Sequence, residues 1–183
     1  RRSSDLTTPD GTITTTVQGA DPRFGMQAPI IKSMTIETPS GLTYTQTAER
    51  EVVLATPGDP LSLQTMTDTV TINDRIYTST YDAATRKITS TTPEGRQSWT
   101  TLDEKGRVVL VETPGLVAVS FTYDARGRLT AITEGTGAEE RITTIAYNAQ
   151  GYIESTTDPL NRTTSFEYDA IGRVVAEILP DGR

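Results

Sequence analysis

The side chains that could do chemistry in this 183-residue chain are carboxylates, hydroxyls, amides and bases, because the sequence contains no histidine and no cysteine. That excludes a Ser-His-Asp triad, a Cys-His nucleophile, a thiolate or imidazole zinc site and any disulfide. The 24 Asp and Glu residues could include a glycosidase pair, but their spacing distinguishes no two of them. The sequence therefore predicts a protein that is not an enzyme and that carries no cofactor or metal.

A repeated Tyr-Asp pair is the strongest pattern in the sequence. Its five heads are Tyr81, Leu102, Tyr123, Tyr147 and Tyr168, which by subtraction lie 21, 21, 24 and 21 residues apart. An acidic or amide residue follows each head, and Gly and Arg follow most of them at the fourth and fifth positions. The candidate repeat-turn residues in these columns are Tyr81, Asp82, Arg86, Asp103, Gly106, Arg107, Tyr123, Asp124, Gly127, Arg128, Tyr147, Gly151, Tyr168, Asp169, Gly172 and Arg173.

A Tyr-Asp pair could stack on a sugar or exchange protons, but a turn needs the same residues. Asp169 suits the first position of a type I turn, and Gly172 suits the fourth, where a positive φ makes a bulge. The runs 164–168 and 174–178 alternate as strands do, and a Pro-x-Gly turn at 180–182 then returns the chain. We therefore expect each unit to be a tight hairpin, with positive φ at Gly127 and Gly172. Thr85, in the same column as these glycines, should bear strain or mark an altered turn.

The fourth unit indicates which residues face each other across a turn. It replaces Asp by Asn148 and, at the same time, Arg by Tyr152, so both charges are lost together. We infer that the acidic and basic members of the other units pair across their turns. The expected pairs are Asp82/Arg86, Asp103/Arg107, Asp124/Arg128 and Asp169/Arg173.

The elements that position these turns should be β-strands throughout. The sequence has 35 threonines, a β-branched type that suits a polar pleated surface, and no stretch has helical periodicity. Residues 1–72 keep only fragments of the repeat, as turns at 8–12, 38–41 and 56–59, and we interpret them as diverged hairpins. Residues 73–183 hold the five regular units, continuous with the first part, and a further hairpin should turn at Asn73-Asp74.

The columns closely resemble the YD repeats of the Rhs family, in which a Tyr-Asp head precedes Gly-Arg, a strand and a Pro-x-Gly turn. The segments 123–129 and 168–174 match that pattern in full. The resemblance implies an array of antiparallel hairpins in a twisted sheet that spirals into a hollow shell, which in the family's bacterial toxins encloses a C-terminal toxic domain. It also implies a bacterial, secreted or cell-surface protein. The family's self-cleaving Pro- and Asp-rich motif is not present in this sequence.

From this resemblance we expect a non-catalytic segment of the repeat shell of a larger exported protein. Arg183 closes a Pro-x-Gly-Arg turn, which predicts that the array continues beyond it. The partners implied are the neighbouring repeats and an enclosed effector domain of the same parent. We also expect self-association through open sheet edges near 163–179 or 12–17.

An alternative function is an extracellular carbohydrate- or cell-surface-binding module. Trp99 and Tyr152 are its candidate glycan contacts, although packing within the hairpins is the competing use of both rings. A formal net charge of −7 argues against a nucleic-acid partner, which needs a concentrated basic surface. The apolar runs are also far shorter than the roughly 20 residues of a membrane span.

Overall fold

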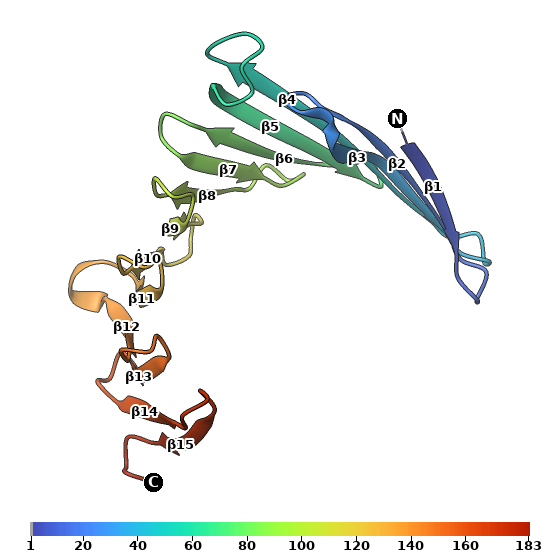
Figure 1. The fold of residues 1–183 in the computed structure, drawn as a ribbon. Coiled ribbons are helices and arrows are strands. Elements are labelled where there is room, and N and C mark those ends of the chain that lie inside the picture. Colours follow the sequence, from blue (N-terminus) through green and yellow to red (C-terminus); the bar gives the residue numbers. More distant parts are fainter. Residues whose placement is uncertain (1) are drawn as a thin grey trace. The chain divides into compact units, whose positions relative to one another are not determined.

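The computed structural model describes residues 2–183 as fifteen β-strands and one short 3₁₀ helix. The strands follow one another in chain order in a single antiparallel sheet (Figure 1). A sheet in which every strand neighbours its predecessor is what consecutive hairpins produce. The all-β class and the array of antiparallel hairpins predicted from the sequence are therefore confirmed.

The chain divides into two compact units, Arg1–Glu104 and Lys105–Arg183. The strands of the first unit are β1 (Arg2–Thr7), β2 (Ile13–Asp21), β3 (Gly25–Glu37), β4 (Thr43–Leu54), β5 (Leu63–Ile72), β6 (Arg75–Asp82), β7 (Lys87–Thr91) and β8 (Gln97–Leu102). The second unit contains β9 (Val108–Glu112), β10 (Val119–Tyr123), β11 (Leu129–Glu134), the 3₁₀ helix η1 (Gly137–Glu139), β12 (Arg141–Tyr147), β13 (Ile153–Thr157), β14 (Thr163–Tyr168) and β15 (Val174–Ile178). The division at residue 72 drawn from the repeat pattern stays a prediction.

Long strands dominate the first unit. β4 and β5 pair from Gln46↔Ile72 to Leu54↔Leu63, with one register shift near the end. The predicted hairpin at Asn73-Asp74 is confirmed, because both residues have positive φ and Ile72 pairs with Arg75 across a two-residue turn. One expectation was wrong. Residues 12–17 do not form an edge, since β2 pairs with β1 on one side and with β3 on the other.

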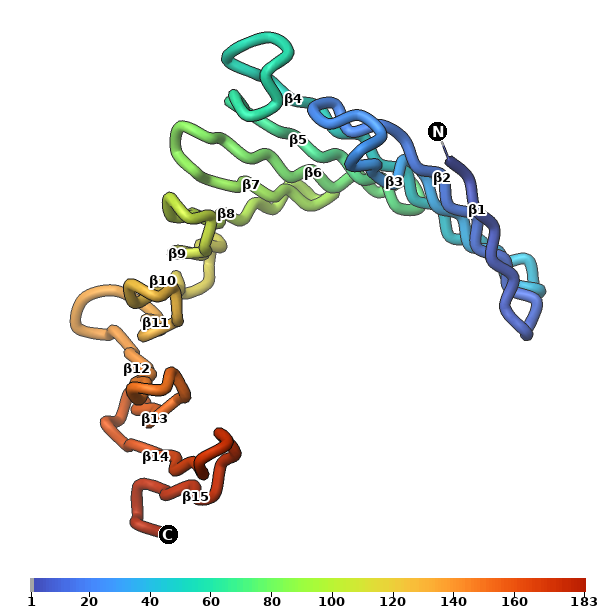
Figure 2. The backbone as a smooth tube through the Cα atoms, viewed as in Figure 1, coloured from blue at the N-terminus to red at the C-terminus, as the bar shows by residue number. Residues whose placement is uncertain are grey.

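The strands of the second unit are short, and Figure 2 shows the backbone turning back every few residues there. The register shifts directly before the head residue in three of its hairpins, those of Tyr123, Tyr147 and Tyr168. Gly127 and Gly172 have φ of 86° and 84°, which confirms the predicted positive values. The column of Thr85 marks an altered turn, because Arg86 takes the left-handed conformation instead, with φ of 53°.

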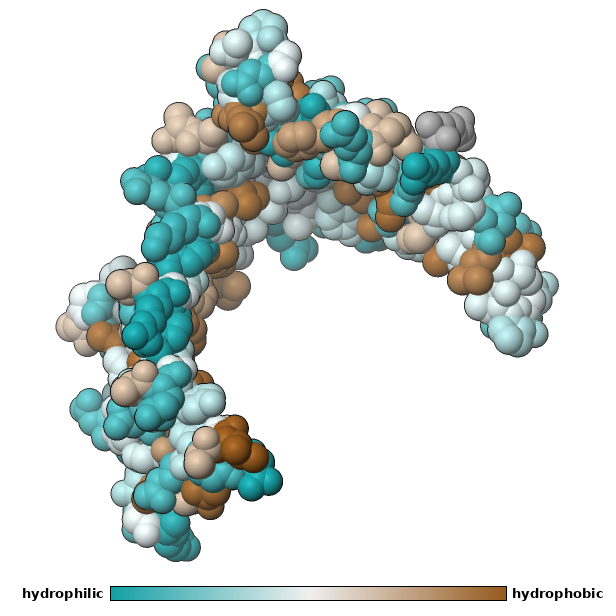
Figure 3. Space-filling model, viewed as in Figure 1, coloured by the Kyte–Doolittle hydropathy of each residue, from teal (hydrophilic) through white to brown (hydrophobic). Residues whose placement is uncertain are grey.

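Across residues 2–183 the structure buries no hydrophobic side chain, and its one buried residue is Asp21, at 3% exposure. Hydrophobic residues therefore appear beside hydrophilic ones on the visible surface of each unit (Figure 3). A sheet without a dry core depends on backbone hydrogen bonds, turn geometry and half-buried side chains.

Among the described residues, no helix has the length and apolar character needed to cross a membrane.

Candidate functional site

The Asp of each regular turn closes the turn through its side chain. Asp124 Oδ1 accepts the N–H groups of Arg126 and Arg128, both at 2.9 Å, while the Asp124 carbonyl accepts the N–H of Gly127. Arg128 Nε then donates to Asp124 Oδ2 at 2.7 Å. The Arg128 N–H is the main reason why the pKa of Asp124 lies below its usual value.

The inferred pairing across the turn is confirmed for two of the expected pairs. Besides Asp124 and Arg128, Arg173 Nε lies 2.7 Å from Asp169 Oδ2. The expected pair of Asp82 and Arg86 is wrong. Asp82 accepts from the backbone and hydroxyl of Thr85 instead, because Arg86 has turned away into the left-handed conformation.

Asp103 and Arg107 remain a predicted pair. A further pair, which the sequence analysis did not identify, joins Asp158 and Arg162, with Arg162 Nε 2.7 Å from Asp158 Oδ2. Its signal was available, since Asp158 and Arg162 have the same four-residue spacing. Asn161 occupies the glycine position there, with φ of 59°.

The fourth Tyr-Asp repeat forms the same turn although it has neither the aspartate nor the arginine. Asn148 Oδ1 accepts the N–H groups of Gly151 and Tyr152, at 3.0 and 2.9 Å. An amide oxygen therefore replaces the carboxylate as the acceptor, and the turn itself does not require the ion pair.

The tyrosines connect consecutive hairpins. The hydroxyls of Tyr123, Tyr147 and Tyr168 donate, each at 2.8 Å, to the carbonyl oxygens of Val108, Leu129 and Ile153, respectively. Each acceptor comes directly after the Arg or Tyr of the preceding turn. The head of one unit is thus hydrogen-bonded to the backbone of the unit before it.

The residue before each acceptor stacks on the same tyrosine. The guanidinium carbon of Arg107 lies 4.4 Å from the Tyr123 ring centre, and that of Arg128 lies 4.2 Å from the Tyr147 ring centre. In the next hairpin Tyr152 takes this place, with its ring centre 4.9 Å from that of Tyr168 and an interplanar angle of 23°. We call these three stacks, with their hydroxyl–carbonyl bonds, the turn ladder.

The turn glycines give the turn ladder its space. A Cβ on Gly127 would lie 3.3 Å from a terminal nitrogen of Arg107, and one on Gly151 would lie 3.5 Å from that of Arg128. A Cβ on Gly172 would overlap the phenol of Tyr152. The glycine column therefore provides a positive φ within its own turn and room for the side chain that comes from the preceding turn.

The two candidate glycan contacts lie in different compact units of the fold. Trp99 is in β8, where the Lys87 ammonium lies 5.1 Å from its ring centre, and Tyr152 precedes β13 and packs on Tyr168. Each ring thus makes the packing contact that the sequence analysis gave as the competing use. Glycan binding stays a prediction.

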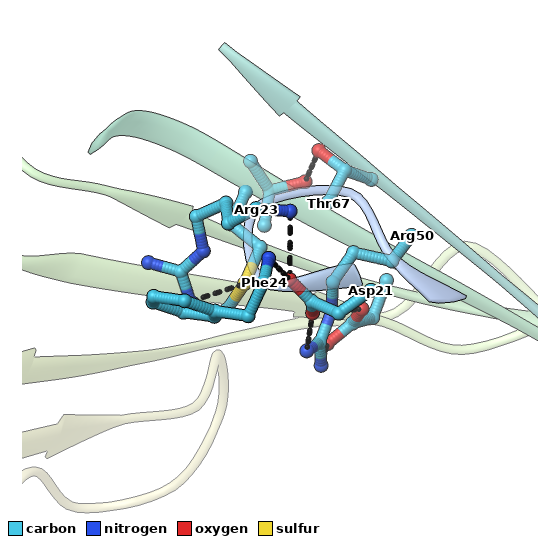
Figure 4. Close-up of polar contacts among 8 residues, drawn as sticks. Asp21, Arg23, Phe24, Arg50 and Thr67 are labelled. Atoms are coloured by element: carbon cyan, nitrogen blue, oxygen red, sulfur yellow. Dashed lines mark hydrogen bonds and ion pairs between the residues drawn. The ribbon is translucent and has the colours of Figure 1, made fainter. Parts of the chain in front are cut away.

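A separate polar cluster holds the end of the β2–β3 hairpin against β4 and β5. Asp21 Oδ1 accepts the N–H groups of Arg23 and Phe24 at 2.8 and 3.1 Å, and its Oδ2 lies 3.0 Å from Arg50 Nη1 (Figure 4). Arg50 also donates two hydrogen bonds, of 2.6 and 2.8 Å, to the carboxylate of Asp68 in β5. Arg23 lies over the Phe24 ring, at 4.9 Å.

Opposing effects act on Asp21. Burial, the largest of them, raises its pKa, but the hydrogen bonds from Arg23, Arg50 and Phe24 together outweigh burial and hold the pKa below the usual value. Asp21 is therefore an ionised, fully coordinated carboxylate at neutral pH. We call Asp21, Arg50 and Asp68 the hairpin latch. None of its residues lies in a repeat column, so no spacing in the sequence indicates it.

Comparison with known proteins points to one family. The family model described as Teneurin YD-shell matches residues 3–183. No curated protein matches the sequence.

Solved structures that resemble the chain belong to much longer proteins. The crystal structure of TcdB2-TccC3-Cdc42 has 15% sequence identity and a TM-score of 0.49, and that of TcdB2-TccC3-TEV has 16% identity and a TM-score of 0.47. Both comparisons cover 96% of this chain and 11% of the other. The Tc holotoxin pore of Photorhabdus luminescens has 16% identity and a TM-score of 0.43, over 94% of this chain and 10% of the other. The chain thus spans about a tenth of the length of the proteins it matches.

Proposed function

The chain belongs to the teneurin YD-shell family, and from that membership we propose that it is a non-catalytic structural segment of the β-repeat shell of a larger exported Rhs-type protein. The shell would encapsulate or present a C-terminal effector domain of the same parent. The parent would be a bacterial secreted or cell-surface protein. The partners of this segment are then the neighbouring repeats and the enclosed effector.

The turn ladder is the observation that carries this proposal. In three successive repeats it joins one Tyr-Asp turn to the head tyrosine of the next, through a hydroxyl–carbonyl bond and a stacked guanidinium or ring. Repeats that cannot bury a core alone are stabilised by their neighbours. A wall built in this way can extend for as long as the repeats continue, as a shell requires.

The side-chain chemistry of the site supports a structural role. The turn carboxylates Asp124, Asp158 and Asp169 all have pKa values below the usual one, because backbone N–H groups and an arginine bind each of them. Such carboxylates stay ionised and occupied, whereas a general acid at neutral pH needs a raised pKa. The groups hold turns together in the positions where the repeat places them.

Protease protection of the effector in the full-length parent tests the proposal. With an intact wall, the effector should resist a protease that cleaves it once it is released by denaturant. Arg128→Ala combined with Tyr147→Ala removes one step of the turn ladder and should expose the effector to cleavage. Arg126→Ala is the matched control, because it changes an arginine of the same turn for which the structure shows only a backbone hydrogen bond. Cleavage of the effector in the wild-type parent as fast as after its release by denaturant would contradict enclosure.

A further inference from the structure

A polar hollow of about 590 Å³ opens between the fourth and fifth turns of the repeat. Its lining includes Asn148, Tyr152, Glu154, Glu167 and Tyr168. β13 and β14 pair from Ser155↔Ser165 to Thr157↔Thr163. The two strands are therefore not paired through their backbones at the end where the hollow lies. The opening follows from this local separation of the strands.

The hollow lies beside the one regular turn that lacks its arginine. In the two preceding steps of the turn ladder, a guanidinium of the chain itself covers the head tyrosine. Here Tyr152 covers Tyr168, and Tyr152 is 41% exposed. The position has lost a positive charge and gained an accessible aromatic face.

Two carboxylates of the lining have no counterpart in the same columns of the other repeats. Glu154 is the seventh residue after its head, where the other units have Ile88, Val109, Thr130 and Val175. Glu167 directly precedes its head, where the other units have Thr80, Thr101, Thr122 and Ala146. Both glutamates are exposed, and neither has an ion pair in the described part of the chain. Alternation along β14 places Glu167 on the face opposite Tyr168, so Glu154 is the carboxylate on the side of the stacked rings. The remaining charged group of the lining, Asp169, is already paired with Arg173.

We propose that this hollow binds an arginine side chain of a partner polypeptide, which lies on Tyr152 and pairs with Glu154. A guanidinium stacks well on an aromatic face and binds carboxylates with two bonds. The protein itself shows the preference, since Arg107 and Arg128 cover the tyrosines of the neighbouring turns at 4.4 and 4.2 Å. The partner thus restores the cation that the fourth unit has lost. This inference goes beyond the shell function and holds whether or not an effector is enclosed.

Titration of the 183-residue chain with N-acetyl-L-arginine amide, followed by amide NMR shifts, tests the site. Saturable shifts are expected at residues 148–154 and 167–170, and they should weaken as salt is added. The decisive variant is Asn148→Asp with Tyr152→Arg, which rebuilds a regular repeat and places the chain's own guanidinium over Tyr168. Because its neighbours already have this sequence pattern, the variant should fold, and it should bind the probe about tenfold more weakly.

A second variant and two controls separate this site from a general acidic surface. Glu154→Gln should weaken binding about threefold, whereas Glu177→Gln in β15, outside the hollow, should leave it unchanged. The uncharged analogue N-acetyl-L-citrulline amide should give no saturable shift. Equal binding by the rebuilt repeat, an equal loss on Glu177→Gln, equal binding of the citrulline probe or the absence of saturable shifts in the wild type would each overturn the proposal.

Discussion

In the first unit β4 and β5 pair over most of their length, whereas in the second unit β9 and β10 pair only at Val119↔Val111 and Ser120↔Leu110. The side chains differ in the same sense. The first unit has the hairpin latch, in which the buried Asp21 binds Arg50 and Arg50 binds Asp68. The second unit has the turn ladder, in which the same tyrosine contact occurs three times.

The difference shows two ways to hold a sheet that has no buried apolar core. A long strand pair gains a backbone hydrogen bond with each pair of residues, and each bond contributes about 1 kcal/mol net. A strand of five residues has few such bonds, so side chains that reach from one turn to the next must contribute a larger share. A repeated contact can do this in every hairpin, whereas a single latch is needed only where a hairpin end folds over its neighbours.

The largest effect should come from Asp21→Ala. The change leaves two backbone N–H groups and one arm of Arg50 without their acceptor in a buried site, and we expect a loss of about 3 kcal/mol in unfolding free energy. Urea unfolding followed by the fluorescence of Trp99, which lies in the same unit, measures it. Asp68→Ala is the control and should cost less, because the Asp68 side chain is 32% exposed. A larger loss for Asp68→Ala would place the latch elsewhere.

The contribution of Asp21 should also depend on pH. Because the pKa of Asp21 in the folded protein lies below the usual 3.8, its contribution to stability is complete above that value. It should be lost as the pH falls from about 3.8 through the folded pKa. The difference in unfolding free energy between the wild type and Asp21→Asn should therefore narrow in that window. It should stay constant between pH 5 and 7, because pH 5 is already about one unit above the usual carboxylate pKa. A gap that closes near neutral pH would contradict the ionised latch.

The next largest effect should be Gly172→Ala in the turn ladder. Both Gly172 and Gly41 of the first unit have positive φ, of 84° and 82°, but only at Gly172 would a Cβ meet a side chain. We expect a loss of about 2 kcal/mol at Gly172 and about 1 kcal/mol at Gly41, where backbone strain acts alone. Thermal unfolding of the two variants measures the difference. Equal losses would show that the space at Gly172 for the Tyr152 ring contributes nothing to stability.

The sequence predicted the turns well because a turn is local. Spacing alone identified the glycines at 127 and 172 and the Asn73-Asp74 hairpin, since a positive φ restricts the residue types at a single position. It missed β1, whose polar residues show no apolar alternation and are all exposed. A strand with no buried face lacks the alternation of apolar and polar residues by which strands are predicted from sequence.

Contacts between turns and between distant strands leave no comparable pattern in the sequence. The co-substitution of Asn148 and Tyr152 indicated pairing inside one turn, yet Tyr152 also stacks on the next unit's Tyr168. The hairpin latch joins residues 29 and 18 positions apart, and no repeat relates them. Such contacts depend on the path of the chain after each turn, which spacing does not specify.

Removal of one hydroxyl should sharpen the comparison between the units. Tyr147→Phe leaves the Leu129 carbonyl without its cross-hairpin donor, and we expect a loss of about 1 kcal/mol. Tyr44→Phe removes a hydroxyl that bonds Gln46, two residues away on the same strand, and should change stability by less than about 0.5 kcal/mol. Chemical denaturation compares the two. A larger loss at Tyr44 would mean that the first unit also depends on its tyrosine hydroxyls.

The smallest effect should have the opposite sign. Arg86 holds φ of 53°, a conformation that glycine adopts without strain, and its side chain makes one exposed ion pair with Glu104, at 3.9 Å. Relief of strain should exceed the lost pair and the greater flexibility of the unfolded chain, so Arg86→Gly should stabilise the protein by about 0.5 kcal/mol. Asn161→Gly in the second unit is the control and should change little, because asparagine tolerates the left-handed region. Calorimetric melting of both variants measures the shift. If Arg86→Gly destabilises the protein, the guanidinium contributes more than its exposed pair, and the last hairpins of the first unit then depend on turn side chains as the second unit does.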